Sequence, residues 1–396
     1  MAICVLAYSG GLDTSVMLKW IPENLGYEVV AVTVNVGQGE NLDEIVKKAR
    51  KLGAKDIFLI DSRREFAEEY VARDIKANGL YDGVYPLSTA LARPLIAKKV
   101  VEIAEKVGAG AVAHGCTGKG NDQVRFEIAF RSYAPHLKIL APVRDWNMSR
   151  EEEERYAKER NIPIPSKSKY SIDQNMWGRS IECGEMEDPW YEPPEEAFEW
   201  TVDPRHAPDT PKLLEIEFLK GLPSSIDGEE LPLPLLIEKL NHIAGSHGVG
   251  RIDHIENRVI GLKSREVYEA PAATVLLTAH RDLEKLVLTK RELEIKQYLE
   301  KIWSNLVYSG LWTDPCREDI EAFIERTQER VTGTVRVKLF KGNMRVVGRR
   351  SPFALYEREL ITYRSESTFD QKAAEGFIKL WGLPTTTAAR RLRRKV

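Results

Sequence analysis

The feature of this sequence that most restricts its fold is the alternation of short apolar runs with amphipathic stretches across residues 1–165. The apolar runs are rich in Val, Ile and Leu and have the length of strands: Ile3–Tyr8, Glu28–Val36, Asp56–Asp61, Ala111–His114 and Lys138–Val143. The stretches between them have helical periodicity: Thr14–Ile21, Asn41–Leu52, Arg64–Lys76, Leu91–Val107 and Asp122–Tyr133. This order predicts an α/β domain, a parallel sheet with helices on both faces. Ligands of such sheets bind beyond the carboxyl ends of the strands, here the loops after Tyr8, Val36 and His114.

A different pattern follows in the rest of the chain. Residues 161–208 are rich in Pro and Glu, and we expect them to lead into an α+β domain. In that domain we expect hairpins and long helices, with the hairpins near Leu214–Phe218 and Thr334–Val347 and the helices over Ala279–Leu306 and Arg317–Arg330. The segment from Thr368 has too few apolar residues for a core of its own. The predicted domains are therefore residues 1–165, 166–365 and a C-terminal oligomerisation tail, 366–396.

The composition of the chain argues against several classes of protein. The 58 Lys and Arg residues nearly balance the 60 Asp and Glu residues, for a formal charge of −2, which argues against a protein that coats nucleic acid. No apolar run reaches the ~18 residues that span a bilayer. The N-terminus lacks the basic region of a signal peptide, and the 4 cysteines form no CxxC pair. We therefore expect a cytoplasmic protein with reduced thiols, no membrane partner, no nucleic-acid partner and no structural zinc.

The clearest chemical signal lies directly after the first predicted strand. The chain there reads Ala7, Tyr8, Ser9, Gly10, Gly11, Leu12, Asp13, Thr14 and Ser15. Adjacent glycines let the backbone approach a ligand closely, and the following helix presents free N–H groups to an anion. The string lacks the GK[ST] ending of a P-loop. It predicts a phosphate-binding loop of another kind, and the structural alternative is an ordinary strand-to-helix turn.

A second string follows the fourth predicted strand and runs from His114 to Phe126. It interleaves glycines with Thr117, Lys119, Asn121 and other polar residues, which makes a loop rich in hydrogen-bond donors at the start of a helix. Asp122 and Arg125 are three residues apart and share one helical face. The structural alternative is a capped helix start with a solvated ion pair.

Together these strings resemble a known family. The segment Ala7–Ser15 resembles the pyrophosphate-binding loop of the N-type ATP pyrophosphatases, and with His114–Phe126 it resembles the argininosuccinate synthetase family in particular. The resemblance covers essentially the whole chain through further strings: Tyr85–Pro94, Ser171–Asn175 with Ser180, Gly248–Asp253, Ile255–Arg258, and Lys263–Arg265 with Tyr268–Pro271.

The resemblance implies an AMP-forming carbon–nitrogen ligase of arginine biosynthesis or the urea cycle. The ureido oxygen of citrulline attacks the α-phosphorus of ATP, which releases pyrophosphate and leaves a citrullyl-adenylate. The amine of aspartate then displaces AMP. Both nucleophiles come from substrates, so we expect positioning and charge stabilisation rather than a catalytic nucleophile or base. The resemblance also implies Mg²⁺ with ATP, held without a dedicated protein site, and a homotetramer.

The resemblance also assigns the site residues. It implies that ATP contacts Ala7, Tyr8, Ser9, Gly10, Gly11, Leu12, Asp13, Thr14, Ser15, Val34 and Gly115. For aspartate it implies Thr117, Asn121 and Asp122. For citrulline it implies Tyr85, Ala90, Asn121, Arg125, Ser171, Ser180, Glu256 and Tyr268. Val34 stands where the family usually has alanine beside adenine, so we expect contact there through the backbone. Ala90 stands where the family often has serine; if that hydroxyl binds citrulline, the contact is missing here unless Thr89 replaces it.

Two other classes stay open at this point. Another adenylating N-type ATP pyrophosphatase, such as a tRNA-modifying thiolase, would need an RNA-binding module or catalytic cysteines. A non-catalytic nucleotide sensor would explain the first string and leave the others idle. Gly108–Ala113 fits GxGxxA, but it precedes a strand and is interpreted as a helix C-cap. We interpret the aromatic residues of 177–200 as loop packing, and the basic C-terminus as solvated or subunit-contacting.

Overall fold

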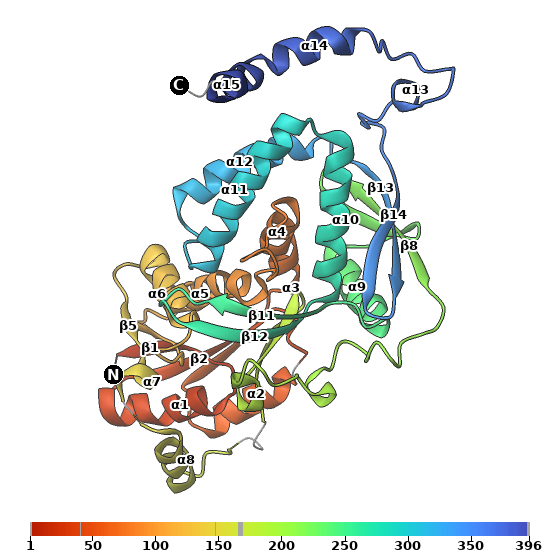
Figure 1. Ribbon diagram of the computed structural model, residues 1–396. Coiled ribbons are helices and arrows are strands. Elements are labelled where there is room, and N and C mark those ends of the chain that lie inside the picture. Colours follow the sequence, from red (N-terminus) through yellow and green to blue (C-terminus); the bar gives the residue numbers. More distant parts are fainter. Residues whose placement is uncertain (1, 40, 147, 165–168, 394–396) are drawn as a thin grey trace. The chain divides into compact units, whose positions relative to one another are not determined.

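The computed structural model describes residues 2–39, 41–146, 148–164 and 169–393. Its first part is a parallel sheet with the strand order β3-β2-β1-β4-β5 (Figure 1). The strands are β1 Ile3–Ala7, β2 Glu28–Asn35, β3 Asp56–Asp61, β4 Ala111–Ala113 and β5 Lys138–Leu140. The predicted parallel sheet is confirmed. The last strand is shorter than predicted and ends before Val143, because Pro142 begins a short helix.

Helices cover both faces of this sheet, as predicted. They are α1 Leu12–Leu25, α2 Leu42–Lys51, α3 Arg63–Glu65, the π-helical turn η1 Phe66–Val71, α4 Ala72–Lys76, α5 Ser88–Lys106, α6 Asp122–Tyr133, α7 Pro142–Asp145 and α8 Arg150–Glu159. Leu6 of β1 belongs to an apolar core with α1 and α2, whereas its neighbour Val5 belongs to the core on the α5 face. Side chains alternate between the faces of a strand, so both faces of β1 are buried. After α5, Gly108 takes a left-handed φ of 63°, which confirms the helix C-cap.

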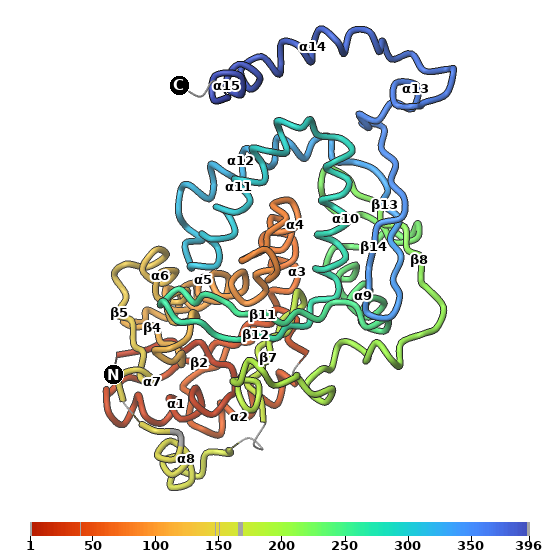
Figure 2. Tube along the Cα trace, viewed as in Figure 1, coloured from red at the N-terminus to blue at the C-terminus, as the bar shows by residue number. Residues whose placement is uncertain are grey.

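The second part of the chain contains two antiparallel sheets, in the orders β10-β9-β8-β13-β14 and β11-β12-β7-β6. Their strands are β6 Ser171–Asn175, β7 Gly178–Glu182, β8 Lys212–Leu219, β9 Leu222–Ile226, β10 Glu229–Glu230, β11 Arg251–Asn257, β12 Lys263–Glu269, β13 Gly333–Phe340 and β14 Asn343–Arg350. Figure 2 traces β11 and β12 as one long hairpin. Both predicted hairpins are confirmed, as β8–β9 and β13–β14. The description of residues 161–208 as a simple connection is wrong, because β6 and β7 lie there.

The helices of this part are η2 Gly184–Glu187, η3 Glu195–Ala197, α9 Leu233–Ser246, α10 Pro271–Val287, α11 Lys290–Tyr308 and α12 Pro315–Gln328. The prediction of one helix over Ala279–Leu306 is wrong, because the chain breaks between α10 and α11. Thr289 caps α11: its hydroxyl accepts a hydrogen bond from the Glu292 N–H, and the Glu292 carboxylate accepts one from the Thr289 N–H at 2.9 Å. This capping box provides acceptors for the N–H groups of Thr289 and Glu292 at the start of α11, so a new helix begins at this point.

A buried charge network ties α4 to α10 and α11. The Lys296 ammonium is fully buried, lies 2.9 Å from Glu284 and donates to the Lys76 carbonyl at 2.8 Å. It also pairs with Glu300. Asn78, just after α4, donates to Glu284 and Glu300, both at 2.7 Å. Because each buried charge has partners, the network fixes these helices around one arrangement.

Residues 354–396 form a separate compact unit. It contains α13 Arg358–Ile361, α14 Ala373–Trp381 and α15 Leu383–Arg393. Within α14, the Phe377 and Trp381 rings stack with centroids 5.6 Å apart. None of the residues of these helices is buried, as expected of a segment without its own core. No helix in the described part of the chain is long and apolar enough to cross a membrane.

Asp74 is a buried acidic residue of α4. Its side chain is fully buried and accepts a hydrogen bond from the Trp177 indole at 2.8 Å, across the two parts of the chain. Burial raises the pKa of Asp74 well above the usual aspartate range, and the indole hydrogen bond only partly opposes this effect. The folded protein therefore keeps a proton on Asp74 at pH values where the unfolded chain has lost it, and this linkage lowers stability as pH rises.

We predict that Asp74→Asn removes this pH dependence. The amide stays neutral in both states, so the unfolding free energy of the variant relative to the parent should rise between pH 5 and pH 8. Each unit of pKa difference corresponds to about 1.4 kcal/mol. Denaturant unfolding at several pH values measures the effect, and a stability difference between the two proteins that stays constant with pH would contradict it.

Candidate active site

A cavity of about 1330 Å³ opens at the carboxyl ends of the parallel strands. Its wall includes residues from the sheet, from α5 and α6, and from the β6–β7 and β11–β12 hairpins. Most of the predicted site residues line it: Ala7, Tyr8, Ser9, Gly11, Thr14, Val34, Tyr85, Gly115, Thr117, Asn121, Asp122, Arg125, Ser171, Ser180, Glu256 and Tyr268. Residues far apart in the sequence thus contribute to one space.

The glycine loop forms the part of the wall after β1. Gly10 has a left-handed φ of 81°, and a side chain there would meet Ile45 of α2 at 3.0 Å. The hydroxyls of Ser9 and Thr14 lie 3.2 Å apart, and the Gly11 N–H donates to Ser9 Oγ at 3.3 Å. The turn therefore gathers hydroxyls and backbone donors at the N-terminus of α1, where a negative ligand is favoured.

The second predicted loop approaches the glycine loop closely. A side chain at Gly115 would lie 2.9 Å from Thr14 Cγ2, so only glycine allows the end of β4 to approach the start of α1. Cys116, Thr117, Lys119 and Gly120 continue the cavity wall from there to α6. Lys48 of α2 donates to the Gly10 carbonyl at 2.7 Å from the other side of the loop.

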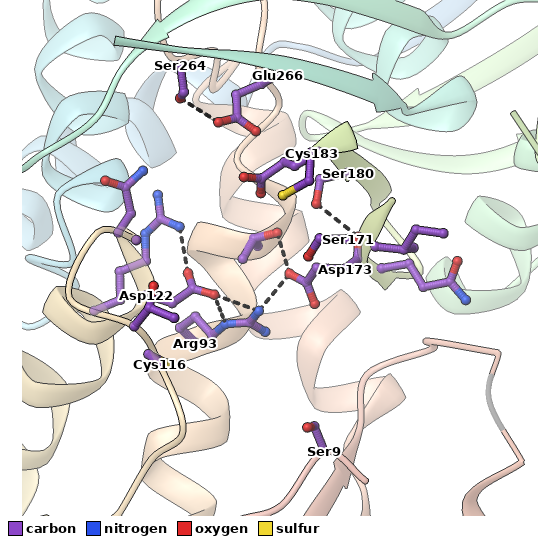
Figure 3. A pocket seen from close by; sticks show the side chains of 18 of the residues that line it. Ser9, Arg93, Cys116, Asp122, Ser171, Asp173, Ser180, Cys183, Ser264 and Glu266 are labelled. Carbon is purple, nitrogen blue, oxygen red and sulfur yellow. Dashed lines mark hydrogen bonds and ion pairs between the residues drawn. The ribbon is translucent and has the colours of Figure 1, made fainter. Parts of the chain in front are cut away.

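Ion pairs join α5, α6 and β6 in the middle of the cavity. Figure 3 shows Arg93 between two carboxylates, 2.8 Å from Asp122 and 2.6 Å from Asp173. Asp122 also pairs with Arg125 at 3.0 Å. Burial alone would raise the pKa of Asp122, but the two arginines outweigh it and hold the pKa below its usual value. Thr89 donates to Asp173 at 2.8 Å. The site therefore holds ionised groups of both signs.

Arg125 lies at the junction with α11. Its Nε donates to the Tyr308 carbonyl at 3.0 Å, and its guanidinium lies 4.9 Å from the centre of the Tyr308 ring. The second terminal nitrogen, Nη2, is buried without a hydrogen-bond partner among the described residues. A buried guanidinium N–H without a partner is costly, so this nitrogen fits an anionic ligand group.

Glu256 is held by two tyrosines. Tyr268 donates to its carboxylate at 2.6 Å, and Tyr308 donates to the other oxygen. Burial would raise the pKa of Glu256, but the adjacent His254 imidazole and the hydrogen bonds from the two tyrosines lower it below its usual value. Tyr85 stacks on Tyr268 with ring centroids 4.4 Å apart. The result is a fixed, ionised carboxylate beside aromatic walls, which suits an ammonium group.

A second acidic group lies on β7 and β12. Arg258 contacts Glu182 at 2.8 Å and Glu266 at 3.0 Å, and it donates to the Lys119 carbonyl at 3.2 Å. Ser264 donates to Glu266 at 2.6 Å (Figure 3). Burial and the neighbouring Glu266 raise the pKa of Glu182 to about 7. Arg258 thus links this acidic pair to the loop that precedes α6.

Some predicted residues lie outside the cavity wall. They are Gly10, Leu12, Asp13, Ser15 and Ala90. Leu12 is buried and Ala90 is buried in α5, while the Ser15 hydroxyl lies 3.2 Å from the Tyr8 hydroxyl and supports the loop from behind. Thr89, proposed as a replacement for the missing hydroxyl at Ala90, does line the cavity.

Other residues of the site received no role from the sequence. Arg93, Asp173 and Arg258 lay in strings that carried the family resemblance, so their charge and position were available as a signal. Tyr308 carried no such signal in the sequence, because it is one tyrosine near the end of a helix. Its role in the site is visible only from the residues that surround it in the folded structure. Its hydroxyl accepts from Asn121 Nδ2 at 2.8 Å, and Asn121 Oδ1 accepts from the Val259 N–H at 2.9 Å.

Comparison with known proteins covers both parts of the chain. Residues 3–163 match the family model described as the Arginosuccinate synthase N-terminal HUP domain, and residues 170–388 match the Arginosuccinate synthase C-terminal domain. The argininosuccinate synthase of Methanocaldococcus jannaschii is 58% identical over 395 residues, 99% of each chain. That of Oceanobacillus iheyensis is 57% identical over 383 residues, 96% of this chain and 92% of the other. That of Listeria monocytogenes strain HCC23 is 56% identical over 387 residues, which are 97% of this chain and 96% of the other.

The parallel sheet, the glycine loop at its carboxyl end and the charged cavity define an ATP-dependent α/β enzyme that acts on small polar substrates. The two models and the relatives together span nearly the full length of the sequence. The chain belongs to the argininosuccinate synthase family. This membership sets aside the tRNA-modifying and sensor alternatives.

Proposed function

We propose that this one cavity at the carboxyl ends of the parallel strands binds all three substrates of the family reaction, with ATP at the glycine loop. This chain is an AMP-forming ligase of arginine biosynthesis, which joins citrulline to aspartate and releases AMP and pyrophosphate. The observation that carries the residue assignment is that Ser9, Thr117 and Glu256 line one continuous space. In this proposal the residues from Ala7 to Ser15 hold the phosphates, and Val34 and Gly115 lie beside the base and sugar.

Citrulline fits the part of the cavity between α6 and β12. Its carboxylate pairs with the unpartnered nitrogen of Arg125, and its ammonium pairs with Glu256. Both charged groups are attached to the α-carbon of citrulline, so these two contacts fix that end of the amino acid, and we propose that its neutral ureido group extends toward the glycine loop. Tyr85, Asn121, Ser171, Ser180 and Tyr268 supply aromatic walls and further hydrogen bonds in the proposal. The role of Ala90 is limited to packing within α5.

Aspartate fits beside the loop that precedes α6. Thr117 donates to one of its carboxylates, Asn121 offers an amide, and Asp122 attracts its ammonium. Asp122 is suited to this role because Arg93 and Arg125 keep it ionised despite burial. The ammonium group of aspartate must lose a proton to become the amine that attacks. The ion pair with Asp122 therefore cannot be so strong that it prevents this deprotonation.

The proposed chemistry depends on positioning. In the first step the ureido oxygen forms a bond to the α-phosphorus while the bond to the bridging oxygen of pyrophosphate breaks. In the second step the aspartate nitrogen bonds to the ureido carbon while the carbon–oxygen bond to AMP breaks. Alignment of bound reactants can supply on the order of 7–11 kcal/mol. The donors around the glycine loop are mainly hydroxyls and N–H groups, so we propose that Mg²⁺ arrives with ATP and is held mainly by phosphate oxygens and water.

The remaining proposals concern organisation. We propose domains at residues 1–165, 166–365 and 366–396, a boundary pattern supported by the family models over 3–163 and 170–388. We propose a homotetramer, supported by the apolar side chains that α14 and α15 leave exposed. We propose a cytoplasmic location, supported by the free thiols of Cys4, Cys116, Cys183 and Cys316.

We predict that Ser9→Ala slows citrulline-dependent release of pyrophosphate. Loss of a hydroxyl that faces charged phosphates should cost about 1.5–3 kcal/mol in kcat/KM for ATP. A pyrophosphate-release assay with ATP and citrulline measures this, and Ser132→Ala on the exposed face of α6 serves as the control. Parent-like release by Ser9→Ala would remove Ser9 from the phosphate site. Release by the parent enzyme that does not depend on citrulline would contradict the proposed reaction.

We predict that Thr117→Val raises the KM for aspartate and leaves the KM for citrulline nearly unchanged. Valine has the shape of threonine but cannot donate a hydrogen bond to a carboxylate. Steady-state kinetics with each substrate varied in turn measures both constants, and Thr278→Val on α10 is the matched control. Equal increases in both constants would mean that the loop itself, rather than an aspartate contact, had been damaged.

We predict that truncation before Thr368 weakens the oligomer. Phe377, Ile378, Leu380, Trp381 and Leu383 are all more than half exposed, and burial of each side chain against another subunit would contribute roughly 1.5–3 kcal/mol. Sedimentation of the truncated chain should give a species smaller than the full-length oligomer, with a lower melting temperature. An unchanged oligomer would show that the tail does not hold the subunits together.

A further inference from the structure

The edge of β2 that faces the cavity extends beyond its neighbouring strand. The Tyr8 N–H donates to the Val32 carbonyl at 2.8 Å, at the point where β1 ends. Alternate residues of a strand direct their backbone polar groups to the same side. Val34 therefore presents its backbone toward the side of β1 at a position beyond the last residue of β1. Val36 follows β2 directly, and both valines line the cavity.

A side chain from the same loop occupies these backbone groups. The Val36 N–H donates to Gln38 Oε1 at 2.8 Å, and Gln38 Nε2 donates to the Val34 carbonyl at 3.0 Å. Gly37 and Gly39 have left-handed φ values of 89° and 71°, which fold the chain back so that the Gln38 amide reaches the strand. The primary amide thus closes a two-hydrogen-bond ring with the strand edge.

The Gln38 amide presents the same order of hydrogen-bond acceptor and donor as one edge of an adenine base. A carboxamide offers one acceptor oxygen and one donor N–H on neighbouring positions, and adenine offers its N1 acceptor and N6 donor in the same order. A base placed at Val34 would need the very N–H and C=O groups that Gln38 now uses. A base that used these two groups and the Gln38 amide would exclude each other, because Gln38 engages both the Val36 N–H and the Val34 carbonyl.

We propose that Gln38 is a nucleobase-specificity residue that occupies the adenine-binding edge of β2 until ATP displaces its amide. The inference rests on the proposed function, in which the base lies at Val34. ATP binding then exchanges two hydrogen bonds of Gln38 for two of adenine, and a ligand that cannot replace both leaves a buried group unpaired. The exchange makes ATP binding weaker than an open edge would allow, and it makes the site selective for a base with this donor and acceptor order.

The surroundings give the displaced amide a place to go. The Gln38 backbone carbonyl accepts a hydrogen bond from Gln174 Nε2 of β6, so the loop stays attached while its side chain moves. The other atom of that amide, Gln174 Oε1, is buried without a hydrogen-bond partner among the described residues. It lies on the side chain that already holds the Gln38 backbone, and it offers an acceptor for the freed Gln38 N–H.

Calorimetric titration of the full-length enzyme with ATP and, separately, with inorganic pyrophosphate tests this proposal. Citrulline and aspartate are left out so that no turnover occurs. Gln38→Ala should bind ATP more tightly than the parent, by about five-fold or more, the factor associated with one net hydrogen bond. Its affinity for pyrophosphate should not change, because pyrophosphate does not reach the strand edge. Gln297→Ala, an exposed glutamine of α11, controls for the substitution itself.

Three results would overturn the proposal: unchanged ATP affinity, weaker ATP binding, or equal tightening for ATP and pyrophosphate. Gln38→Met keeps the length of the side chain without its hydrogen bonds and repeats the test if the alanine variant is less stable. Failure of the proposed function looks different, because the parent would then bind neither ATP nor pyrophosphate at this cavity and Ser9→Ala would have no effect on either.

Discussion

The ion pairs of Arg93 hold the active site together. Arg93 projects from α5 of the parallel-sheet domain and contacts Asp122 of α6 and Asp173 of β6, so one guanidinium joins three elements of two different architectures. Burial would lower the pKa of Arg93, but the two carboxylates outweigh it and keep the side chain charged. Removal of the arginine would leave Asp122 with Arg125 alone and Asp173 without a cationic partner among the described residues, which is the costly direction for buried charges. The cavity therefore depends on this interaction for both its shape and its charge.

The other charged groups of the cavity are also held by specific neighbours. Asp122 can pair with Arg125 as well, which leaves one Arg125 nitrogen for a ligand. Tyr268 and Tyr308 also fix Glu256, a hydrogen-bond acceptor of opposite charge to Arg125. The protein thus presents one cationic and one anionic partner, each held in place by its neighbours, for the two charged groups of an amino-acid substrate. A reaction in which substrates supply both nucleophiles needs this kind of preorganisation more than it needs a reactive side chain.

The sequence predicted those features that repeat with the period of a strand or helix. The bounds of β3 and α6 agree with the prediction at both ends, since their apolar patterns begin and end sharply. The break between α10 and α11 was missed although Thr289 and Glu292 form a capping-box signature that marks it. β6 was missed because Ser171–Asn175 is a polar segment that forms a strand only through its partner β7. Tyr308 and the Gln38 amide were beyond prediction, because their roles exist only in the folded contacts.

The central claim is that citrulline is activated in this cavity by formation of a bond between its ureido oxygen and the α-phosphorus of ATP. Citrulline labelled with ¹⁸O at the ureido oxygen tests it when the enzyme completes its reaction with ATP and aspartate. The account predicts that the label appears in AMP, because the ureido oxygen becomes bonded to the α-phosphorus and leaves with it. AMP without the label, with ¹⁸O in pyrophosphate or water instead, would contradict the account.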